Sequence, residues 1–206
     1  MIVDPEIEKF ILGLLPARDA VLAEMEEQAR QREIPIVGPA VGALLDVLVR
    51  LSHAKRIFEL GSAIGYSTLW LARAAGPGAE VHYTDSSAAR ADEARRYFER
   101  AGVADRIRIH VGDALEELGR VPGEFDFIFN DVDKTGYPTV LEAVPSRLRA
   151  GGLFVTDNAL RHGGVLDPRD AASRAVLDFD SKLFASKEFA SCIVPLRDCL
   201  TIAVRT

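Results

Sequence analysis

The chain has 206 residues, of which 48% are hydrophobic and 27% are charged, and its formal net charge is −6. This composition excludes intrinsic disorder and predicts one domain with a sizeable core. The negative charge, together with the lack of a basic stripe with interleaved aromatic residues, argues against nucleic acid as a partner. No apolar run reaches the roughly 20 residues of a membrane helix, so no membrane partner is expected. We therefore expect a cytoplasmic protein that acts on a small molecule.

The first 53 residues have helical periodicity, interrupted by Pro16 and by residues 34–39. Apolar residues recur at helical spacing in two stripes, which consist of Ile7, Phe10, Ile11, Leu14 and Leu15, and of Val41, Leu44, Leu45, Leu48 and Val49. Such stripes pack either on the rest of the chain or on a second copy. We expect a homodimer, with packing on the parent domain as the alternative.

From residue 54 onward, short apolar runs alternate with helical stretches, as in repeated strand–helix units on a parallel sheet. The runs predict strands at 56–60, 80–84, 107–111, 125–130 and 153–156, and the stretches predict helices at 67–75, 88–101, 114–118 and 137–148. The last two runs, 189–194 and 200–204, predict an antiparallel hairpin, because the five residues between them are too few for a crossover. The expected fold is one α/β domain over 1–206. It has N-terminal helices in 1–53 and a doubly wound, mostly parallel seven-stranded sheet in 54–206.

A glycine-containing turn follows the first predicted strand, in the sequence Glu59-Leu60-Gly61-Ser62-Ala63-Ile64-Gly65-Tyr66-Ser67. Gly61 can adopt positive φ and has no Cβ to collide with a ligand, and the next helix offers free N–H groups to a carboxylate or phosphate. Three residues separate Gly61 from Gly65, whereas the dinucleotide fingerprint is G-x-G-x-x-G, so this spacing disfavours a nicotinamide cofactor. The alternative is a tight turn that binds no ligand.

Carboxylates also follow the next two predicted strands. Asp85 can accept hydrogen bonds from both hydroxyls of a ribose, or it can cap the helix that begins after Ser86. Asp113, which Ala114 follows, can accept a hydrogen bond from the exocyclic amine of adenine, or it can cap the next helix. We give these two roles equal weight. Open α/β sheets bind ligands at this edge, and the three strand ends together fit S-adenosylmethionine.

The fourth and fifth predicted strands are followed by a second cluster of polar side chains. Asp131, Asp157 and Asn158 offer hard oxygen ligands, which suit Mg²⁺ with open positions for substrate oxygens and water. Lys134 beside such an ion is the candidate catalytic base. The alternatives are that the aspartates only cap or turn after their strands, and that Lys134 is a solvated surface lysine.

The stretch from Glu59 to about Val165 resembles the metal-dependent catechol and caffeoyl-CoA O-methyltransferases, which are class I S-adenosylmethionine-dependent enzymes with a Rossmann-like fold. The resemblance rests on the order of several short motifs: Gly65-Tyr66-Ser67, Ala101-Gly102-Val103 before Asp105-Arg106-Ile107, Gly112-Asp113-Ala114, Asp133-Lys134 with Tyr137, and Gly151-Gly152-Leu153 before Asp157-Asn158.

The resemblance implies a role for each matching residue. Lys134 is then the base beside Asp131, and the metal ligands are Asp131, Asp157 and Asn158. The cofactor pocket consists of Glu59, Gly61, Ser62, Tyr66, Ser67, Asp85, Ser86, Asp113, Ala114 and Asp131.

The predicted function is methyl transfer, assisted by a divalent metal, to a hydroxyl of a catechol-like or hydroxycinnamoyl-type acceptor with vicinal oxygens. Shortly after the Asp157-Asn158 pair, members of the family commonly have a tryptophan, whereas this chain carries Arg161 followed by His162. The alternatives are a nicotinamide-linked oxidoreductase and a non-enzymatic S-adenosylmethionine-binding protein.

Overall fold

The computed structural model describes residues 4–206 and contains one seven-stranded sheet with the strand order β3-β2-β1-β4-β5-β7-β6. Strands β1 to β5 are parallel, and β7 runs antiparallel to both β5 and β6. The strands are β1 Arg56–Leu60, β2 Glu80–Asp85, β3 Ile107–Val111, β4 Phe125–Asn130, β5 Leu148–Thr156, β6 Phe189–Val194 and β7 Leu200–Arg205. The predicted doubly wound sheet with a C-terminal hairpin is confirmed.

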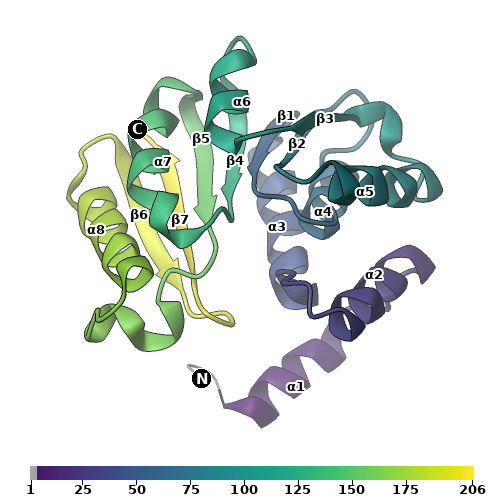
Figure 1. The fold of residues 1–206 in the computed structure, drawn as a ribbon, viewed down its shortest axis with the longest axis horizontal. Helices are drawn as coiled ribbons and strands as arrows, with labels where there is room; N and C mark the ends of the chain where they lie inside the picture. Colours follow the sequence, from purple (N-terminus) through teal and green to yellow (C-terminus); the bar gives the residue numbers. More distant parts are fainter. Residues whose placement is uncertain (1–3) are drawn as a thin grey trace.

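Helices cover both faces of the sheet, with α3, α4 and α5 on one side and α7 and α8 on the other (Figure 1). The helices are α1 Pro5–Leu14, α2 Ala20–Gln31, α3 Gly38–Ser52, α4 Tyr66–Ala75, α5 Ala88–Arg100, α6 Ala114–Arg120, α7 Tyr137–Ala143 and α8 Ala171–Ala185. Across residues 4–206, none of these helices is both long and apolar enough to cross a bilayer.

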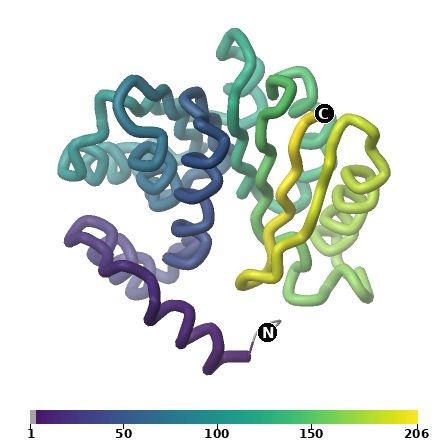
Figure 2. Tube along the Cα trace, turned by 180° about the vertical axis from the view of Figure 1, so that it is seen from behind, coloured from purple at the N-terminus to yellow at the C-terminus, as the bar shows by residue number. Residues whose placement is uncertain are grey.

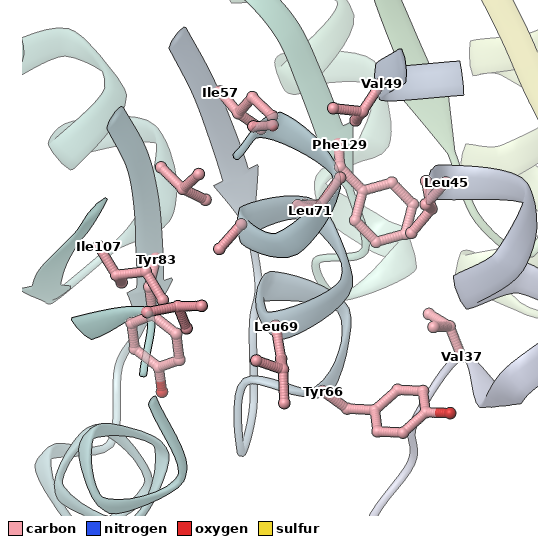
Figure 3. Packing of buried hydrophobic residues seen from close by; sticks show 14 of the residues in the cluster. Val37, Leu45, Val49, Ile57, Tyr66, Leu69, Leu71, Tyr83, Ile107 and Phe129 are labelled. Carbon is pink, nitrogen blue, oxygen red and sulfur yellow. The ribbon is translucent and has the colours of Figure 1, made fainter. Parts of the chain in front are cut away.

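The central strands are apolar on both faces because they lie between the two helical layers. Successive residues of β4 enter different cores: Phe127 and Phe129 pack with α3 and α4, whereas Ile128 packs with α7 and α8. Figure 3 shows Phe129 facing Leu45 of α3 in the first of these cores.

Two differences from the sequence prediction concern the chain around β5. The helix expected to reach residue 148 ends at Ala143 and continues as a short 3-10 turn, Val144–Ser146, because Pro145 has no N–H to extend the α-helix. Helix α8 was not predicted at all. Its buried Val176, Phe179 and Leu183 have helical spacing, and Asp170 caps it by accepting a hydrogen bond from Ser173 N at 2.7 Å.

The N-terminal helices differ in how they pack. Helix α3 packs along α4, and α2 contributes the buried Leu22, Met25 and Ala29 to the core. Helix α1 has no buried residue and extends away from the sheet (Figure 2).

Candidate active site

A cleft of about 1780 Å³ opens at the carboxyl ends of the parallel strands. The loops after β1 to β5 line it, together with the turn between β6 and β7 and the segment that joins α2 to α3. Nine of the predicted site residues line this cleft: Gly61, Asp85, Ser86, Asp113, Ala114, Asp131, Lys134, Asp157 and Asn158. The structure therefore brings the two predicted halves of the site into one cavity.

Gly61 has a structural reason to be glycine that the sequence does not reveal. Its φ is +84°, and a Cβ on it would lie 2.7 Å from the main-chain oxygen of Asp131. The Gly61 N–H donates to Thr84 Oγ1 at 3.2 Å. The glycine thus permits close contact between the ends of β1 and β4, in addition to any approach by a ligand.

Four predicted cofactor residues, Glu59, Ser62, Tyr66 and Ser67, are buried and do not line the cleft. The Tyr66 hydroxyl donates to Glu26 Oε1 at 2.8 Å, which ties α4 to α2. Figure 3 shows this hydroxyl pointing toward the segment that contains Val37. The structure thus gives Tyr66 a packing role, and its contact with a cofactor stays a prediction.

Glu59 is a fully buried carboxyl group at the base of the turn. Thr68 Oγ1 donates to Glu59 Oε2, whereas Glu59 Oε1 has no hydrogen-bond partner within residues 4–206. Burial raises the pKa of Glu59, and the hydroxyl groups of Ser67, Thr68 and Ser62 oppose that rise. A buried oxygen without a donor is uncommon in folded proteins, so Glu59 retains the capacity to accept one more hydrogen bond.

Asp85 and Asp113 each use one carboxylate oxygen to order the local chain. Asp85 Oδ1 accepts from Ser87 N at 2.7 Å, and Arg90 lies 3.7 Å from Oδ2. Ser87, rather than Asp85, is the N-cap of α5. Asp113 caps α6 through Oδ1, with the N–H groups of Leu115 and Glu116 at 2.9 and 3.0 Å. The capping alternative therefore holds for Asp113, and the cap does not use its second oxygen, Oδ2.

The second cluster places the buried carboxyl group of Asp157 and the half-buried carboxyl group of Asp131 beside one lysine. Lys134 Nζ donates to Asp131 Oδ1 at 2.6 Å and to the Val132 carbonyl at 3.3 Å. Burial raises the pKa of Asp131 even though Lys134 favours its charged form. Burial, and then repulsion from Asp131, raises the pKa of Asp157 to about 7. The two carboxyl groups are therefore close enough for the charged form of one to disfavour ionisation of the other.

Asp198 is a site residue that the sequence alone did not reveal. It is buried in the turn between β6 and β7, and its Oδ2 accepts from Asn158 Nδ2 at 3.3 Å. Its Oδ1 accepts from His162 N at 2.5 Å. Because the amide nitrogen of Asn158 is held by Asp198, the carboxamide oxygen of Asn158 is free to bind a ligand.

No group of three or more His, Cys, Asp or Glu side chains in residues 4–206 is arranged to hold a metal ion. The predicted metal site is of a different composition, because it has two carboxylates and one carboxamide. Its three members line the same cleft.

Comparison with known proteins gives the same assignment over nearly the whole chain. The family model described as O-methyltransferase matches residues 17–206. A protein named catechol O-methyltransferase from Mycobacterium tuberculosis is 34% identical over 171 residues, which cover 82% of this chain and 78% of that protein. A probable caffeoyl-CoA O-methyltransferase from Dictyostelium discoideum is 28% identical, with coverage of 89% and 83%.

Solved structures agree with these relatives. An O-methyltransferase from Bacillus cereus, solved in complex with SAH, superposes with a TM-score of 0.89 at 29% identity, covering 98% of this chain and 97% of that one. The predicted class of enzyme, an S-adenosylmethionine-dependent O-methyltransferase, is confirmed, and the nicotinamide-linked alternative is set aside. The chain belongs to the O-methyltransferase family.

Proposed function

We propose that the chain transfers a methyl group from S-adenosylmethionine to a hydroxyl of a small acceptor with vicinal oxygens, of the catechol or hydroxycinnamoyl type, with the help of a divalent cation, most simply Mg²⁺. The observation that carries this proposal is the pair of carboxyl groups, the half-buried Asp131 and the buried Asp157, at the same edge of the cleft. The names of the relatives from M. tuberculosis and D. discoideum support the acceptor class.

The cofactor would occupy the half of the cleft formed by the loops after β1, β2 and β3. Asp85 Oδ2 pairs with Arg90 only at 3.7 Å and can accept a hydrogen bond from a ribose, Asp113 Oδ2 can accept one from the adenine amine, and the turn at Gly61 borders the same space. We assign the cofactor pocket to Glu59, Gly61, Ser62, Tyr66, Ser67, Asp85, Ser86, Asp113, Ala114 and Asp131. The SAH complex of the B. cereus neighbour supports cofactor binding on this fold.

The second half of the cleft fits a divalent cation in charge and in ligand type. Asp157 is buried and Asp131 is half-buried, and the pKa values of both are raised, so a cation between them would relieve both the desolvation and the mutual repulsion of their charged forms. Asn158 adds a neutral oxygen whose direction is fixed by Asp198. A divalent cation in this place supplies a Lewis acid that favours ionisation of the acceptor hydroxyl.

The residues of the chain would then position the acceptor and take up its proton. Lys134, whose Nζ lies 2.6 Å from Asp131 Oδ1, is the group that would take up the hydroxyl proton, and the acceptor oxygen attacks the methyl carbon of the sulfonium. The new C–O bond forms as the methyl–sulfur bond breaks, and S-adenosylhomocysteine leaves with the electron pair on sulfur. Such a step depends mainly on orientation, because holding the two reacting atoms about 3 Å apart removes much of the entropic barrier.

We further propose that α1 packs against a second copy of the chain. Phe10 is 66% exposed and Leu14 is 69% exposed on one face of a helix that buries none of its residues. Apolar side chains gathered in this way are typical of an interface between protein chains. The mass in solution tests this, because Phe10→Ser combined with Leu14→Ser would convert a dimer into a monomer.

The reaction itself is tested with labelled S-adenosylmethionine and a panel of vicinal diols, with Mg²⁺ or with a chelator. Asp157→Asn should lower Mg²⁺-dependent transfer by at least about 100-fold and weaken Mg²⁺ binding in calorimetry, because it removes a charged ligand. Asp105→Asn is the matched control, since the Asp105 side chain is 76% exposed and does not line the cleft. Equal metal dependence in wild type and Asp157→Asn would contradict the metal assignment.

A further inference from the structure

Arg161 is a cation on the wall of the cleft that the proposed reaction does not use. It begins the short 3-10 segment Arg161–Leu166, three residues after Asn158. Its φ is +47° and that of His162 is +53°, so two successive non-glycine residues adopt the left-handed conformation. Such conformations cost free energy, and they persist where surrounding contacts fix them, often at binding sites.

Asp198 supplies the contacts that fix this backbone. One of its oxygens holds His162 N and the other holds the carboxamide of Asn158, so the chain is anchored on both sides of Arg161. The Leu160 N–H donates to the Asp198 carbonyl at 3.3 Å as well. The anchored backbone therefore fixes the position from which the Arg161 side chain extends along the cleft wall.

The guanidinium of Arg161 is short of acceptors. Within residues 4–206 it makes no hydrogen bond, its Nε is buried without a partner, and its ion pair with Asp170 is long, at 4.0 Å. By contrast, Arg197 at the same cleft donates to the carbonyls of Ile36 and Val37. A guanidinium carries five donors in a planar fork that matches a carboxylate, and leaving them unpaired in a partly buried place is unfavourable.

Arg161 lines the same cleft as the proposed base Lys134 and the proposed metal ligands. Its backbone is joined to one of those ligands, because Arg161 N donates to the Asn158 carbonyl at 3.4 Å. An anionic group that reaches Arg161 would accordingly be attached close to the reacting hydroxyl, on the aromatic ring itself or on a short substituent.

We propose that Arg161 binds a carboxylate carried by the acceptor, so that the preferred substrate is an aromatic vicinal diol with a carboxylate substituent rather than an uncharged catechol. This inference rests on the proposed function, because it names the substrate class of the same site. Arg161 acts as a specificity-determining residue and takes no part in the transfer of the methyl group.

The experiment compares 3,4-dihydroxybenzoate with its methyl ester, which has nearly the same shape and no charge. The wild type should have a kcat/KM for the acid at least about tenfold above that for the ester, since a bidentate charge-assisted pair contributes binding of this order. Arg161→Gln should reduce that preference about tenfold, mainly through KM for the acid, and Arg161→Lys should restore part of it. Arg169→Gln is the control, because Arg169 lies in the same loop region, is 86% exposed in its side chain and does not line the cleft.

The outcomes separate the inference from the function on which it rests. Equal kcat/KM for acid and ester in the wild type, or an unchanged preference in Arg161→Gln, would overturn the role of Arg161 while the methyltransferase reaction stands. If Arg161→Gln does not fold, Arg161→Lys and the wild-type preference decide the question by the same criteria. Transfer to neither diol, nor to the wider panel of vicinal diols, would refute the proposed function itself.

Discussion

Gly61→Ala tests the contact that joins the two halves of the site. Alanine at φ +84° costs about 1–2 kcal/mol, because its Cβ approaches the following carbonyl in the left-handed conformation. The same Cβ would lie 2.7 Å from the Asp131 oxygen and 3.0 Å from the Val132 nitrogen. Relieving that overlap must shift the end of β4, at a further cost of about 1–3 kcal/mol. The expected total loss in the free energy of unfolding is about 2–5 kcal/mol.

Gly78→Ala is the matched control for this prediction. Gly78 has φ +77°, and no atom lies within 4 Å of the place that a Cβ would occupy, so the substitution carries only the backbone cost of about 1–2 kcal/mol. Urea unfolding of both variants should therefore place Gly61→Ala about 1–3 kcal/mol below Gly78→Ala. Equal losses in the two variants, with unchanged denaturant slopes, would refute the argument that Gly61 is required by the backbone of Asp131.

Two further predictions concern side chains behind the cleft. Tyr66→Phe should lower the free energy of unfolding by about 1–3 kcal/mol, because it removes a partly buried hydrogen bond to a charged acceptor, Glu26. Unchanged stability with weaker cofactor binding would contradict this role. Burial raises the pKa of Asp180 to about 6, so the folded protein binds this proton more tightly than the unfolded chain and loses stability as the pH rises from about 4 to about 6. The melting temperature of Asp180→Asn should therefore rise relative to that of the wild type as the pH increases from about 4 to about 6. Above that range the difference between the two melting temperatures should stay constant. A gain that does not change with pH, or an equal gain in the exposed Asp178→Asn, would contradict the titration of Asp180.

Most of the sheet could be predicted from the sequence, because a buried strand produces a short local run of apolar residues. The run of Phe125–Asn130, apolar on both faces, predicts a central strand without knowledge of its neighbours. Helix α8 carries a local signal of the same kind, although it was not predicted, since Val176, Phe179 and Leu183 have the spacing of a buried helical face.

The sequence predicted the site residues that directly follow strands. It did not predict the contacts between residues that are far apart in the chain. Asp131 and Asp157 meet because the ends of β4 and β5 are neighbours in a parallel sheet. Asp198, however, acts on Asn158 across 40 residues, and the bond from Tyr66 to Glu26 likewise spans 40 residues. Such pairs depend on the packing of separate elements, and local pattern carries no information about them.

We propose that Asp131, Asp157 and Asn158 hold a divalent cation that assists methyl transfer to a vicinal diol. The most direct measurement is the rate of transfer from labelled S-adenosylmethionine to 3,4-dihydroxybenzoate in Mg²⁺ and in chelator. We expect transfer with Mg²⁺, a fall of at least about 100-fold in chelator, and recovery when Mg²⁺ is restored. Transfer at the same rate in chelator, with cofactor still bound, would contradict this proposal.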